Sequence, residues 1–313
     1  MYVGIDVGGT NLKAGLTDES GKILAVRRIP LGEFRGSEAF VETLAELTKA
    51  VARDGGIESE NLEYVGMGFP GAVAEETVLY TCNIPLENVP VGELFRRYLP
   101  VPVILGNDAD CAAVGEYFCG AGRGTKNFCV VTLGTGVGGG MILNGKLYSG
   151  MGAAGEVGHM VIRSDGVLCS CGRKGCWETY ASATGLIRMT REAMEQDRQS
   201  LLWELSGGLK GVSGRTAFQA VTRGDAAARR VCDEYLVCLA AGITNLVNIL
   251  QPEVLAVGGG ISNESDELLL HPLQEIVARE CYSRHGGYLT KIIKAELGND
   301  AGLIGAALLP KAR

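Results

Sequence analysis

The stretch Asp6-Val7-Gly8-Gly9-Thr10-Asn11-Leu12-Lys13 joins two short apolar runs near the start of the chain and decides the fold. The runs have strand-type residues, so the glycines predict a tight turn between two strands. Such glycines let the backbone approach phosphate oxygens, Thr10 can donate from its hydroxyl, and Asp6 can hold Mg²⁺ directly or through water. Lys13 would neutralise phosphate charge. The turn leads into a strand and lacks a Gly-Lys-Ser/Thr ending, so it is neither of the two standard nucleotide-binding loops. The alternative interpretation is a glycine turn that binds no phosphate.

The same ingredients return at Leu133-Gly134-Thr135-Gly136-Val137-Gly138-Gly139-Gly140, again between two strand-type runs. Two such turns in successive halves predict an internally duplicated α/β architecture that holds a nucleotide between its halves. A third segment, Gly258-Gly259-Gly260, follows a buried apolar run and offers a surface without side chains against which an adenosine can lie. A bulge would explain this last segment equally well.

Apolar spacing predicts the remaining elements and their order along the chain. Further strands are expected at 22–29, 64–69, 73–80, 101–105, 128–133, 139–143, 254–257 and 291–295. Helices are expected at 37–52 with Ser37 as cap, and at 92–98, 108–119, 181–195, 215–221, 225–250, 266–280 and 300–309. The small residues Gly120-Ala121-Gly122 suit a hinge, which predicts a small lobe over 1–120 and a large lobe over 121–297.

Composition limits the class of protein. With 313 residues, 46% of them hydrophobic, the chain is expected to fold as two globular domains. The net charge of −7 and the absence of a basic run argue against general nucleic-acid binding. No basic leader precedes the first acidic residue and no apolar run reaches membrane-spanning length, so we expect no membrane association and a cytoplasmic location. Ten cysteines then indicate reduced thiols or metal ligands, not disulfides.

A cluster of metal-ligand residues is the most specific chemical signal in the sequence. His159 is followed by Cys169, Cys171 and Cys176, so three thiols and one imidazole fall within a short segment. These are the four ligands of a closed tetrahedral Zn²⁺ site, which would be structural because no position is left for water. Metal-activated hydrolysis is therefore disfavoured. The alternative is that the cysteines are merely buried apolar residues.

Three carboxylates are candidates for chemistry. Glu156 and Glu178 bracket the cysteine-rich loop, where a bound metal would hold them still to accept hydrogen bonds from sugar hydroxyls; solvated surface acids are the ordinary alternative. Asp108 follows Asn107 where a strand gives way to a helix, at the carboxyl end where α/β sheets bind ligands. An ionised Asp108 can accept a hydroxyl proton during phosphoryl transfer. Alternatively, Asp108 only caps the helix.

Together these motifs resemble the ROK family, a branch of the actin-like ATPase (ribonuclease H-like) fold that includes bacterial glucokinases. The resemblance covers nearly the whole chain. The matching motifs are Asp6-x-Gly-Gly-Thr10-x-x-Lys13, Gly68-Phe69-Pro70-Gly71, Asn107-Asp108, Leu133-Gly-Thr-Gly-x-Gly138, Glu156-x-Gly-His159, Cys169-x-Cys-Gly-x-x-Gly-Cys176-x-Glu178 and Leu297-Gly-Asn-Asp-Ala-Gly-Leu-Ile-Gly305.

The resemblance implies an ATP- and Mg²⁺-dependent kinase that phosphorylates a hexose, with Asp108 as general base. It also implies zinc on the cysteine-rich loop, with His159 binding the metal through one nitrogen and facing the sugar with the other. Family members usually form homodimers, and the final helix, 298–313, packs back on the small lobe. The implied sugar-binding residues are Gly68, Asn83, Asn107, Asp108, Glu156, His159 and Glu178.

The exact sugar stays open at this point. Glucose is the first expectation, and N-acetylmannosamine, allose and fructose are alternatives, because Leu86-Glu87-Asn88-Val89 departs from the Gly-Trp often found beside the sugar pocket. A sugar-responsive repressor would carry an N-terminal winged-helix domain, for which the position of the first motif leaves no room. A sugar-binding regulator without kinase activity is disfavoured by the intact Lys13, Asp108 and glycine turns.

Overall fold

The computed structural model describes residues 1–81, 84–287 and 289–313, and the chain divides into two compact units. Unit 1 comprises Met1–Val130, Gly140–Gly155 and Glu296–Arg313, and unit 2 comprises Val131–Gly139 and Glu156–Ala295. Each unit is described separately below. The functional lobe limits expected from the sequence, 1–120 and 121–297, stay a prediction.

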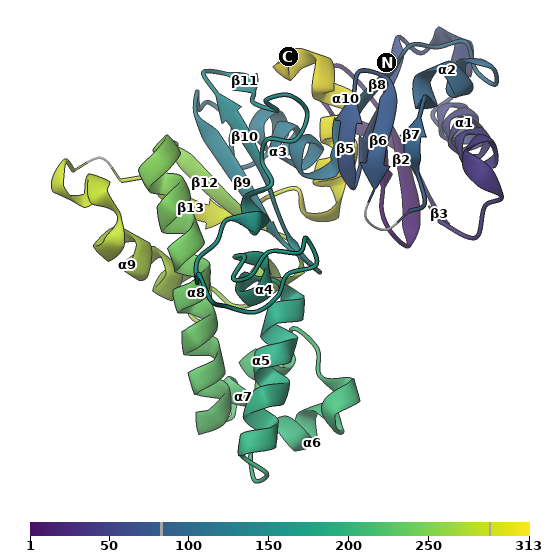
Figure 1. Ribbon diagram of the computed structural model, residues 1–313. Coiled ribbons are helices and arrows are strands. Elements are labelled where there is room, and N and C mark those ends of the chain that lie inside the picture. The colour runs from purple at the N-terminus through teal and green to yellow at the C-terminus, as the bar shows by residue number, and fades with distance from the viewer. Residues whose placement is uncertain (82–83, 288) are drawn as a thin grey trace. The chain divides into compact units, whose positions relative to one another are not determined.

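Unit 1 is built on a five-stranded sheet in the order β3-β2-β1-β4-β8 (Figure 1). Its strands are β1 (Tyr2–Val7), β2 (Asn11–Thr17), β3 (Ile23–Pro30), β4 (Tyr64–Phe69) and β8 (Val103–Asn107). The first three strands form an antiparallel meander, whereas β4 pairs in parallel with both β1 and β8. The carboxyl ends of β1, β4 and β8 therefore lie at the same edge of the sheet.

Helices and a small sheet complete the first part of unit 1. They are α1 (Gly36–Asp54), α2 (Val91–Arg96), α3 (Asp108–Cys119), β5 (Gly71–Ala74), β6 (Thr77–Thr81) and β7 (Glu87–Val89). The predicted cap Ser37 is wrong: α1 begins at Gly36, and its N-cap position, Arg35, makes no side-chain cap bond. The apolar face of α1, with Phe40, Leu44 and Val51 fully buried, places the helix against the meander as its spacing predicts.

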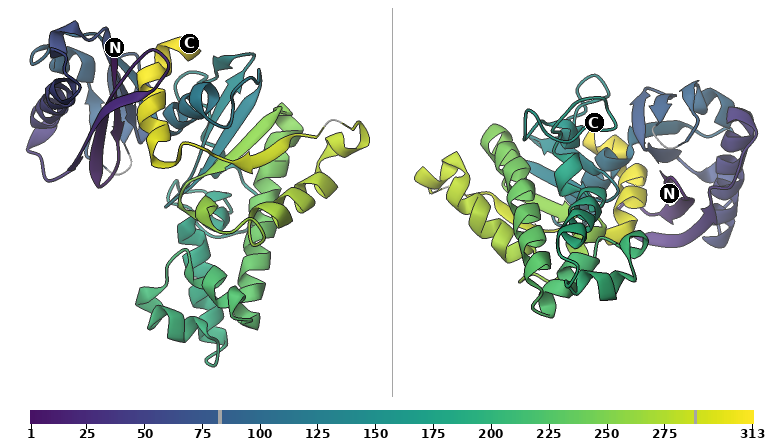
Figure 2. Two further views of the ribbon diagram at one scale, coloured as in Figure 1. Left: turned by 180° about the vertical axis from the view of Figure 1, so that it is seen from behind. Right: turned by 60° about the horizontal axis from the view of Figure 1, so that its bottom comes forward.

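The C-terminal helix α10 (Ala301–Ala312) packs on the sheet and on α3 through backbone contacts that glycines permit. A Cβ on Gly4 would lie 2.0 Å from the Leu303 carbonyl oxygen, and one on Gly66 would lie 1.8 Å from that of Ala306. Figures 1 and 2 show α10 in yellow beside the strands of unit 1. The predicted return of the final helix is therefore observed within unit 1.

A second five-stranded sheet has the order β11-β10-β9-β12-β13. Its strands are β9 (Phe128–Leu133), β10 (Val137–Leu143), β11 (Lys146–Leu147), β12 (Val254–Gly258) and β13 (Lys291–Lys294). Both sheets follow one scheme, in which a three-strand meander is followed by two later strands on the side of its first strand. The predicted duplication is thus present, and Asn144 and Gly145, between β10 and β11, have the positive φ angles of a tight hairpin turn.

The helices of unit 2 form a group around the long helix α8 (Figure 2). They are α4 (Glu178–Ala181), α5 (Ala183–Gln196), α6 (Leu202–Ser206), α7 (Thr216–Thr222), α8 (Ala226–Leu250) and α9 (Leu270–Glu280). The short α6 has no counterpart among the predicted helices. Helix α9 starts at Leu270, later than the predicted 266, and follows a turn in which the Asp266 carboxylate pairs with Lys294, 2.6 Å away.

Helix α8 is, by length and composition, apolar enough to cross a membrane, which the sequence-based expectation of no such run did not foresee. However, 56% of its apolar window is buried inside the protein. Buried residues such as Tyr235, Leu239 and Ile243 recur along one side of it. Its apolar character is thus accounted for by packing within unit 2, as in the core helix of a globular domain.

Candidate active site

Unit 1 brings Asp6, Gly68, Asn107 and Asp108 to the carboxyl edge of its sheet. Asp6 on β1 is in register with Gly68 on β4, and Phe69 is in register with Asn107 on β8. Asp108 is the first residue of α3. Three neighbouring strands therefore deliver the predicted magnesium-binding and base carboxylates to one edge, where open α/β sheets bind ligands.

The cap of α3 is Asn107 and not Asp108. The Asn107 side chain accepts from the N–H of Ala109 at 2.8 Å and of Asp110 at 3.3 Å, and its amide donates to the Gly71 carbonyl at 3.0 Å. The half-buried Asp108 also accepts from the Ala109 N–H, at 2.9 Å, through Oδ1. The structure therefore assigns the main cap of α3 to Asn107, and the base role of Asp108 and the sugar contact of Asn107 stay predictions.

The first glycine turn is closed by the Gly8 N–H, which donates to the Asn11 carbonyl at 3.0 Å. Gly9 and Thr10 are exposed, and the Asn11 amide donates to the Thr10 hydroxyl at 2.8 Å. The Thr10 carbonyl also accepts from the Leu31 N–H at 2.9 Å, so three bonds fix the turn while its tip stays open to solvent. This is the arrangement a phosphate-binding turn needs.

Asp6 is held in a largely buried place behind that turn. Burial raises the pKa of its carboxyl, an effect that the nearby Lys13 ammonium opposes. A Cβ on Gly302, in the first turn of α10, would lie 3.2 Å from the Asp6 carboxyl carbon, so only glycine leaves the carboxylate ordinary room. A carboxylate kept away from water in this way gains most from a bound cation such as Mg²⁺.

In unit 2 the second glycine turn is held from outside by neighbouring helices. The Gly134 carbonyl accepts from the Ala183 N–H, and the Thr135 carbonyl accepts from the Thr184 hydroxyl, each at 2.8 Å. The Glu178 carboxylate accepts from the Val137 N–H at 3.0 Å. The starts of α4 and α5 thus fix the turn that contains Gly136 and Gly138.

Only glycine fits at two positions beside this second turn. A Cβ on Gly136 would lie 2.2 Å from Glu178 Oε2. Gly259 has a φ of +85°, and its Cβ would lie 2.5 Å from the Leu133 carbonyl oxygen. Gly258-Gly259-Gly260 therefore lies against the start of the second turn, and the two segments that the sequence assigned to one nucleotide are neighbours.

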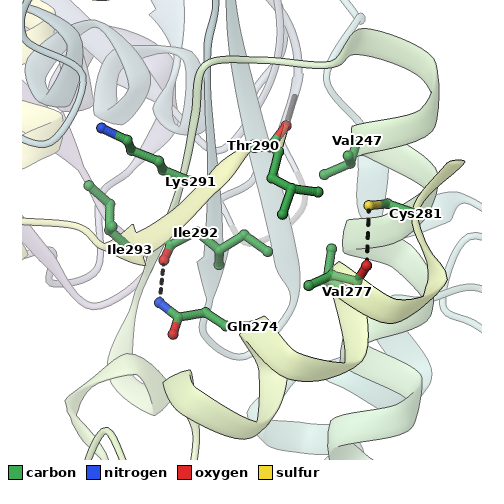
Figure 3. Close-up of a pocket in the computed structure, with 10 residues that line it drawn as sticks. Val247, Gln274, Val277, Cys281, Thr290, Lys291, Ile292 and Ile293 are labelled. Atoms are coloured by element: carbon green, nitrogen blue, oxygen red, sulfur yellow. Dashed lines mark hydrogen bonds between the residues drawn. The ribbon is translucent and has the colours of Figure 1, made fainter. Parts of the chain in front are cut away.

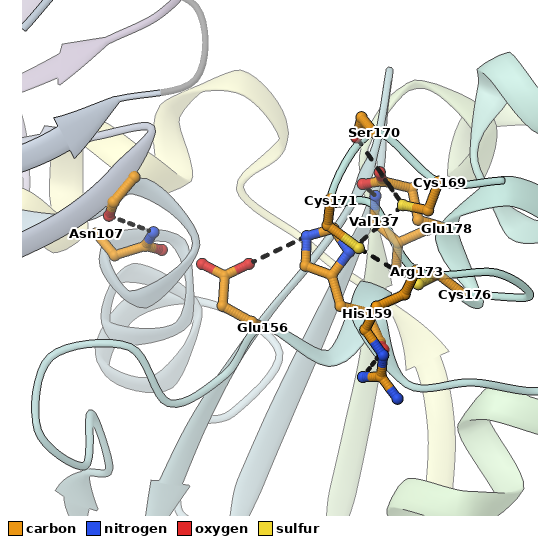
Figure 4. A network of polar contacts seen from close by, with 11 residues as sticks. Asn107, Val137, Glu156, His159, Cys169, Ser170, Cys171, Arg173, Cys176 and Glu178 are labelled. Carbon is orange, nitrogen blue, oxygen red and sulfur yellow. Dashed lines mark hydrogen bonds and ion pairs between the residues drawn. The ribbon is translucent and has the colours of Figure 1, made fainter.

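The predicted metal ligands converge in unit 2 (Figure 4). The ligand atoms of His159, Cys169, Cys171 and Cys176 all lie within 4.8 Å of one another. Cys169 Sγ lies 3.6 Å from His159 Nδ1, and the sulfur atoms of Cys171 and Cys176 are 3.6 Å apart. Three thiols and one imidazole nitrogen around one point are the donor set that Zn²⁺ takes in structural sites, so the residues fit that metal.

The two nitrogens of His159 face different partners. Nδ1 lies on the Cys169 side, and Nε2 lies 3.9 Å from a carboxylate oxygen of Glu156. A backbone hydrogen bond from Arg173 lowers the pKa of the Cys171 thiol, whereas burial raises that of Cys176 to about 12. A metal that bound here would displace the proton of Cys176.

Trp177, between the last cysteine ligand and Glu178, anchors the loop to α8. It is fully buried, and its indole N–H donates to the Cys238 carbonyl at 2.9 Å. A Cβ on Gly242 would lie 2.1 Å from the indole ring, so α8 is shaped around it. This anchor holds Cys176 and Glu178 in place independently of any metal.

A cavity of about 310 Å³ lies elsewhere in unit 2 (Figure 3). Its apolar lining includes Val247, Val277 and Ile292, and Gln274 bridges to the Ile292 carbonyl at 2.8 Å. The first residues of β13 line the cavity, and they pair with the start of β12. Gly258 lies at the opposite end of β12, so the cavity is separate from the glycine segment. None of the residues that the sequence singled out lines it.

The sequence missed several contacts of the site residues, and Asn83 lies outside the described residues. Asp300 forms an ion pair with Lys13, Gly302 faces Asp6, and Thr184 supports the second turn. The first two belong to the motif 297–305, which was noted but given no role. The last has no motif, and only the fold brings it to the turn.

Comparison with known proteins identifies the chain's relatives. The ROK family model matches residues 2–313. The glucokinase of Halalkalibacterium halodurans is 37% identical over 99% of this chain and 94% of its own. The N-acetyl-D-glucosamine kinase of Aliivibrio fischeri is 31% identical over 99% of both chains. A crystal structure of the ROK family glucokinase of Streptomyces griseus, in complex with glucose and AMPPNP, has a TM-score of 0.83 and 34% identity over 98% of both chains. The expected actin-like ATPase fold is confirmed by this likeness.

Proposed function

The chain belongs to the ROK family, and from that premise we propose that it is an ATP-dependent glucokinase that phosphorylates the 6-hydroxyl of glucose. The observation that carries the proposal is the likeness, over nearly the whole chain, to a glucokinase solved with glucose and AMPPNP. The site geometry supports it, because each of the two units holds one preformed glycine turn and one set of candidate sugar contacts.

Asp108 acts as general base in this proposal. Phosphoryl transfer needs positioning, neutralised phosphate charge and one carboxylate that accepts the proton of the attacking hydroxyl. Asp108 stands at the carboxyl edge of the sheet, where Asn107 and not Asp108 supplies the main cap of α3. Its carboxylate accepts the proton from the sugar hydroxyl as that oxygen bonds to the γ-phosphorus and ADP leaves.

The nucleotide phosphates bind at the two glycine turns. Backbone N–H groups of the turns and the Lys13 ammonium contact phosphate oxygens, and Asp6 orients the magnesium ion. Magnesium would neutralise the charge that develops on the leaving phosphate. Adenosine lies against Gly258-Gly259-Gly260, whose glycines leave room for a flat base.

The hexose is held by hydrogen bonds from a set of polar residues. The proposed contacts are Gly68, Asn83, Asn107, Glu156, His159 and Glu178. Zinc on His159 Nδ1 and the three thiols would be structural, and would fix the tautomer that leaves Nε2 for the sugar. Glu178 already accepts from the Val137 N–H, so its carboxylate contacts sugar with the other oxygen.

The remaining properties rest on family resemblance. We expect a cytoplasmic homodimer that supplies phosphorylated sugar to glycolysis. The predicted small lobe, 1–120 with 298–313, and large lobe, 121–297, would close on the sugar and exclude water that would otherwise hydrolyse ATP. Size-exclusion chromatography with light scattering tests the dimer.

The experiment that tests the proposal is an ADP-release assay with purified protein across a panel of hexoses. Glucose should give the highest kcat/KM. A second candidate, an N-acylated hexosamine, is favoured by the 31% identity to the Aliivibrio fischeri N-acetyl-D-glucosamine kinase. The panel therefore contains N-acetylglucosamine, N-acetylmannosamine, allose and fructose. Faster ADP release with any of these sugars than with glucose would reject the glucokinase assignment. ADP release that stays at background with every sugar would reject the proposal that the protein is a hexose kinase.

A further inference from the structure

Lys13 of the first glycine turn is held by the segment that leads into the last helix. Its ammonium donates to the Asn299 carbonyl at 2.8 Å and forms an ion pair with the Asp300 carboxylate. Lys13 lies directly opposite Asp6 in the β1–β2 pairing, so the two side chains share one face of the sheet. The Lys13 ammonium thus lies between two carboxylates: that of Asp6, opposite it on β1, and that of Asp300, 287 residues later in the chain.

The segment that carries these partners is itself fixed by a buried carboxylate. Glu116, near the end of α3, is fully buried. Its Oε1 accepts from the Leu297 N–H at 2.8 Å, and its Oε2 accepts from the N–H groups of Ala121 and Glu296 at 2.9 and 3.1 Å. Three backbone donors satisfy the carboxylate, which explains how a charge is tolerated in the interior. Glu116 therefore ties the entry of the final helix to α3.

A single turn of chain connects the backbone that Glu116 holds to the residues that contact Lys13. The 3₁₀ turn Gly298–Asp300 follows Leu297 directly and ends where α10 begins. Gly298 has a φ of +54°, a conformation that fixes the direction of the turn and that other residues rarely adopt. Asn299 and Asp300 thus reach Lys13 from a backbone that is fixed at both ends, by Glu116 before it and by α10 after it.

We propose that Asp300 is a positioning residue for the phosphate site: together with the Asn299 carbonyl, it orients the Lys13 ammonium toward the nucleotide phosphates, and Glu116 fixes the turn that carries both. An ammonium has three N–H groups. Two of them are directed to Asn299 and Asp300, which leaves the third for a phosphate oxygen. This inference rests on the proposed binding of ATP at the first glycine turn.

The Asp300 carboxylate acts by orientation and not by attraction to the nucleotide, since it has the same sign of charge as phosphate. Without it, the flexible four-carbon side chain of Lys13 would sample many rotamers, and its charge would be spread over them. The ion pair is half-exposed and contributes little to folding stability. Removing it should therefore alter nucleotide binding without altering the fold.

The primary test is Asp300→Asn in the full chain, with AMPPNP affinity measured by calorimetry in the presence of Mg²⁺ and with KM values for ATP and glucose. We expect affinity for AMPPNP to fall and KM for ATP to rise by about tenfold, with KM for glucose and melting temperature unchanged. Glu296→Gln is the matched control, because Glu296 lies in the same segment but its side chain forms an exposed ion pair with Arg123. It should behave as wild type.

A double-mutant cycle with Lys13→Ala decides whether Asp300 acts through Lys13. In the Lys13→Ala background, Asp300→Asn should change AMPPNP affinity by less than about twofold. Unchanged affinity in Asp300→Asn, or a full additional loss in the double variant, would overturn the positioning role. If Lys13→Ala alone leaves AMPPNP affinity intact, it is the proposed phosphate site that fails.

Glu116→Gln tests the anchor. The amide nitrogen of Gln would face backbone N–H groups, so we expect the AMPPNP affinity to fall as in Asp300→Asn and the melting temperature to fall as well. A lower melting temperature with wild-type AMPPNP affinity would remove Glu116 from the proposal and leave Asp300 to be decided by its own variants.

Discussion

At the scale of single residues, the proposed role of Asp108 as general base is tested by an isosteric change. Asp108→Asn keeps the size of the side chain and removes its ability to accept a proton. We expect kcat to fall by about 10³-fold, with glucose affinity largely unchanged, since general bases contribute about 10²–10⁴-fold. Turnover and glucose binding are measured by ADP release and by calorimetry.

The control for that variant is Asp233→Asn, an exposed residue on α8. It should leave both kcat and glucose affinity unchanged. Near-normal turnover in Asp108→Asn would show that another group takes the proton.

Asp6 makes a prediction about stability and pH. Burial raises the pKa of its carboxyl, so the folded state binds this proton more tightly than the unfolded state does. Its ionisation therefore costs stability as pH rises through the raised pKa, and Asp6→Asn removes this cost. In the absence of Mg²⁺, we expect the variant to melt at a higher temperature than wild type at pH 7, with a smaller difference at pH 4.

The opposite sign is expected for Asp54, whose pKa the hydrogen-bonded Arg27 guanidinium lowers. Asp54→Asn should not raise the melting temperature at either pH. If Asp6→Asn melts at the same temperature as wild type or lower at pH 7, the Asp6 charge does not destabilise the folded protein.

The convergence of side chains was predictable from the sequence where a short motif contains the whole arrangement. The four metal ligands fall within one segment, and their thiol and imidazole chemistry indicated zinc before any coordinates. The partner of Lys13 was not predictable in this way, because Asp300 reaches it only when the last helix returns to the first strands. The assignment of the helix cap to Asn107 required the backbone geometry, since adjacent Asn and Asp are both good caps.

At the scale of elements, α10 packs closely on α3 because glycines allow the backbones of the two helices to touch. A Cβ on Gly305 would lie 1.6 Å from the Cys111 carbonyl oxygen of α3, and one on Gly115 would lie 2.3 Å from the Ala301 carbonyl oxygen. The two helices therefore approach more closely than side chains would allow. This contact also fixes the start of α3, which carries Asp108, relative to the start of α10, which faces Asp6.

Gly305→Ala should separate these helices. We expect a loss of about 1–3 kcal/mol or more of unfolding free energy, because the new methyl group meets backbone atoms that cannot rotate away. Urea denaturation measures it. Gly260→Ala, where nothing lies within 4 Å of the added carbon, is the control and should change stability by less than about 0.5 kcal/mol. Equal stability of the two variants would contradict the close packing of α3 and α10.

Elements with strong periodicity were predicted well, and those held by tertiary contacts were not. The limits of α3, β4 and β9 agree with the sequence, because each has an unbroken apolar pattern between polar or glycine boundaries. Helix α6 is too short to show a period. Helix α9 begins after the predicted residue, because residues 266–269 form a turn that the apolar spacing does not distinguish from the helix.

At the scale of the whole molecule, the cysteine and histidine cluster and the second glycine turn are linked through one side chain. Glu178 accepts from the Val137 N–H, and its other oxygen lies 3.8 Å from Cys169 Sγ. The turn, however, is also held by the start of α5, whereas the His159 ring has the cluster on its Nδ1 side and the more exposed Glu156 carboxylate, 3.9 Å away, on its Nε2 side. Loss of the metal should therefore disturb His159 more than the turn.

This argument gives a prediction for zinc removal. Cys171→Ser changes the one exposed ligand, and we expect the affinity for glucose to fall by about 10–100-fold, as for weakened metal sites, with a smaller change in AMPPNP affinity and a lower melting temperature. Chelation of wild type should reproduce these effects, and Cys119→Ser, outside the cluster, should not. In Trp203→Phe, the one remaining tryptophan is Trp177, and its emission would report on the loop because it directly follows the ligand Cys176. Loss of AMPPNP affinity alone, with glucose affinity intact, would contradict the assignment of the zinc loop to the sugar and would place its influence on the second glycine turn through Glu178.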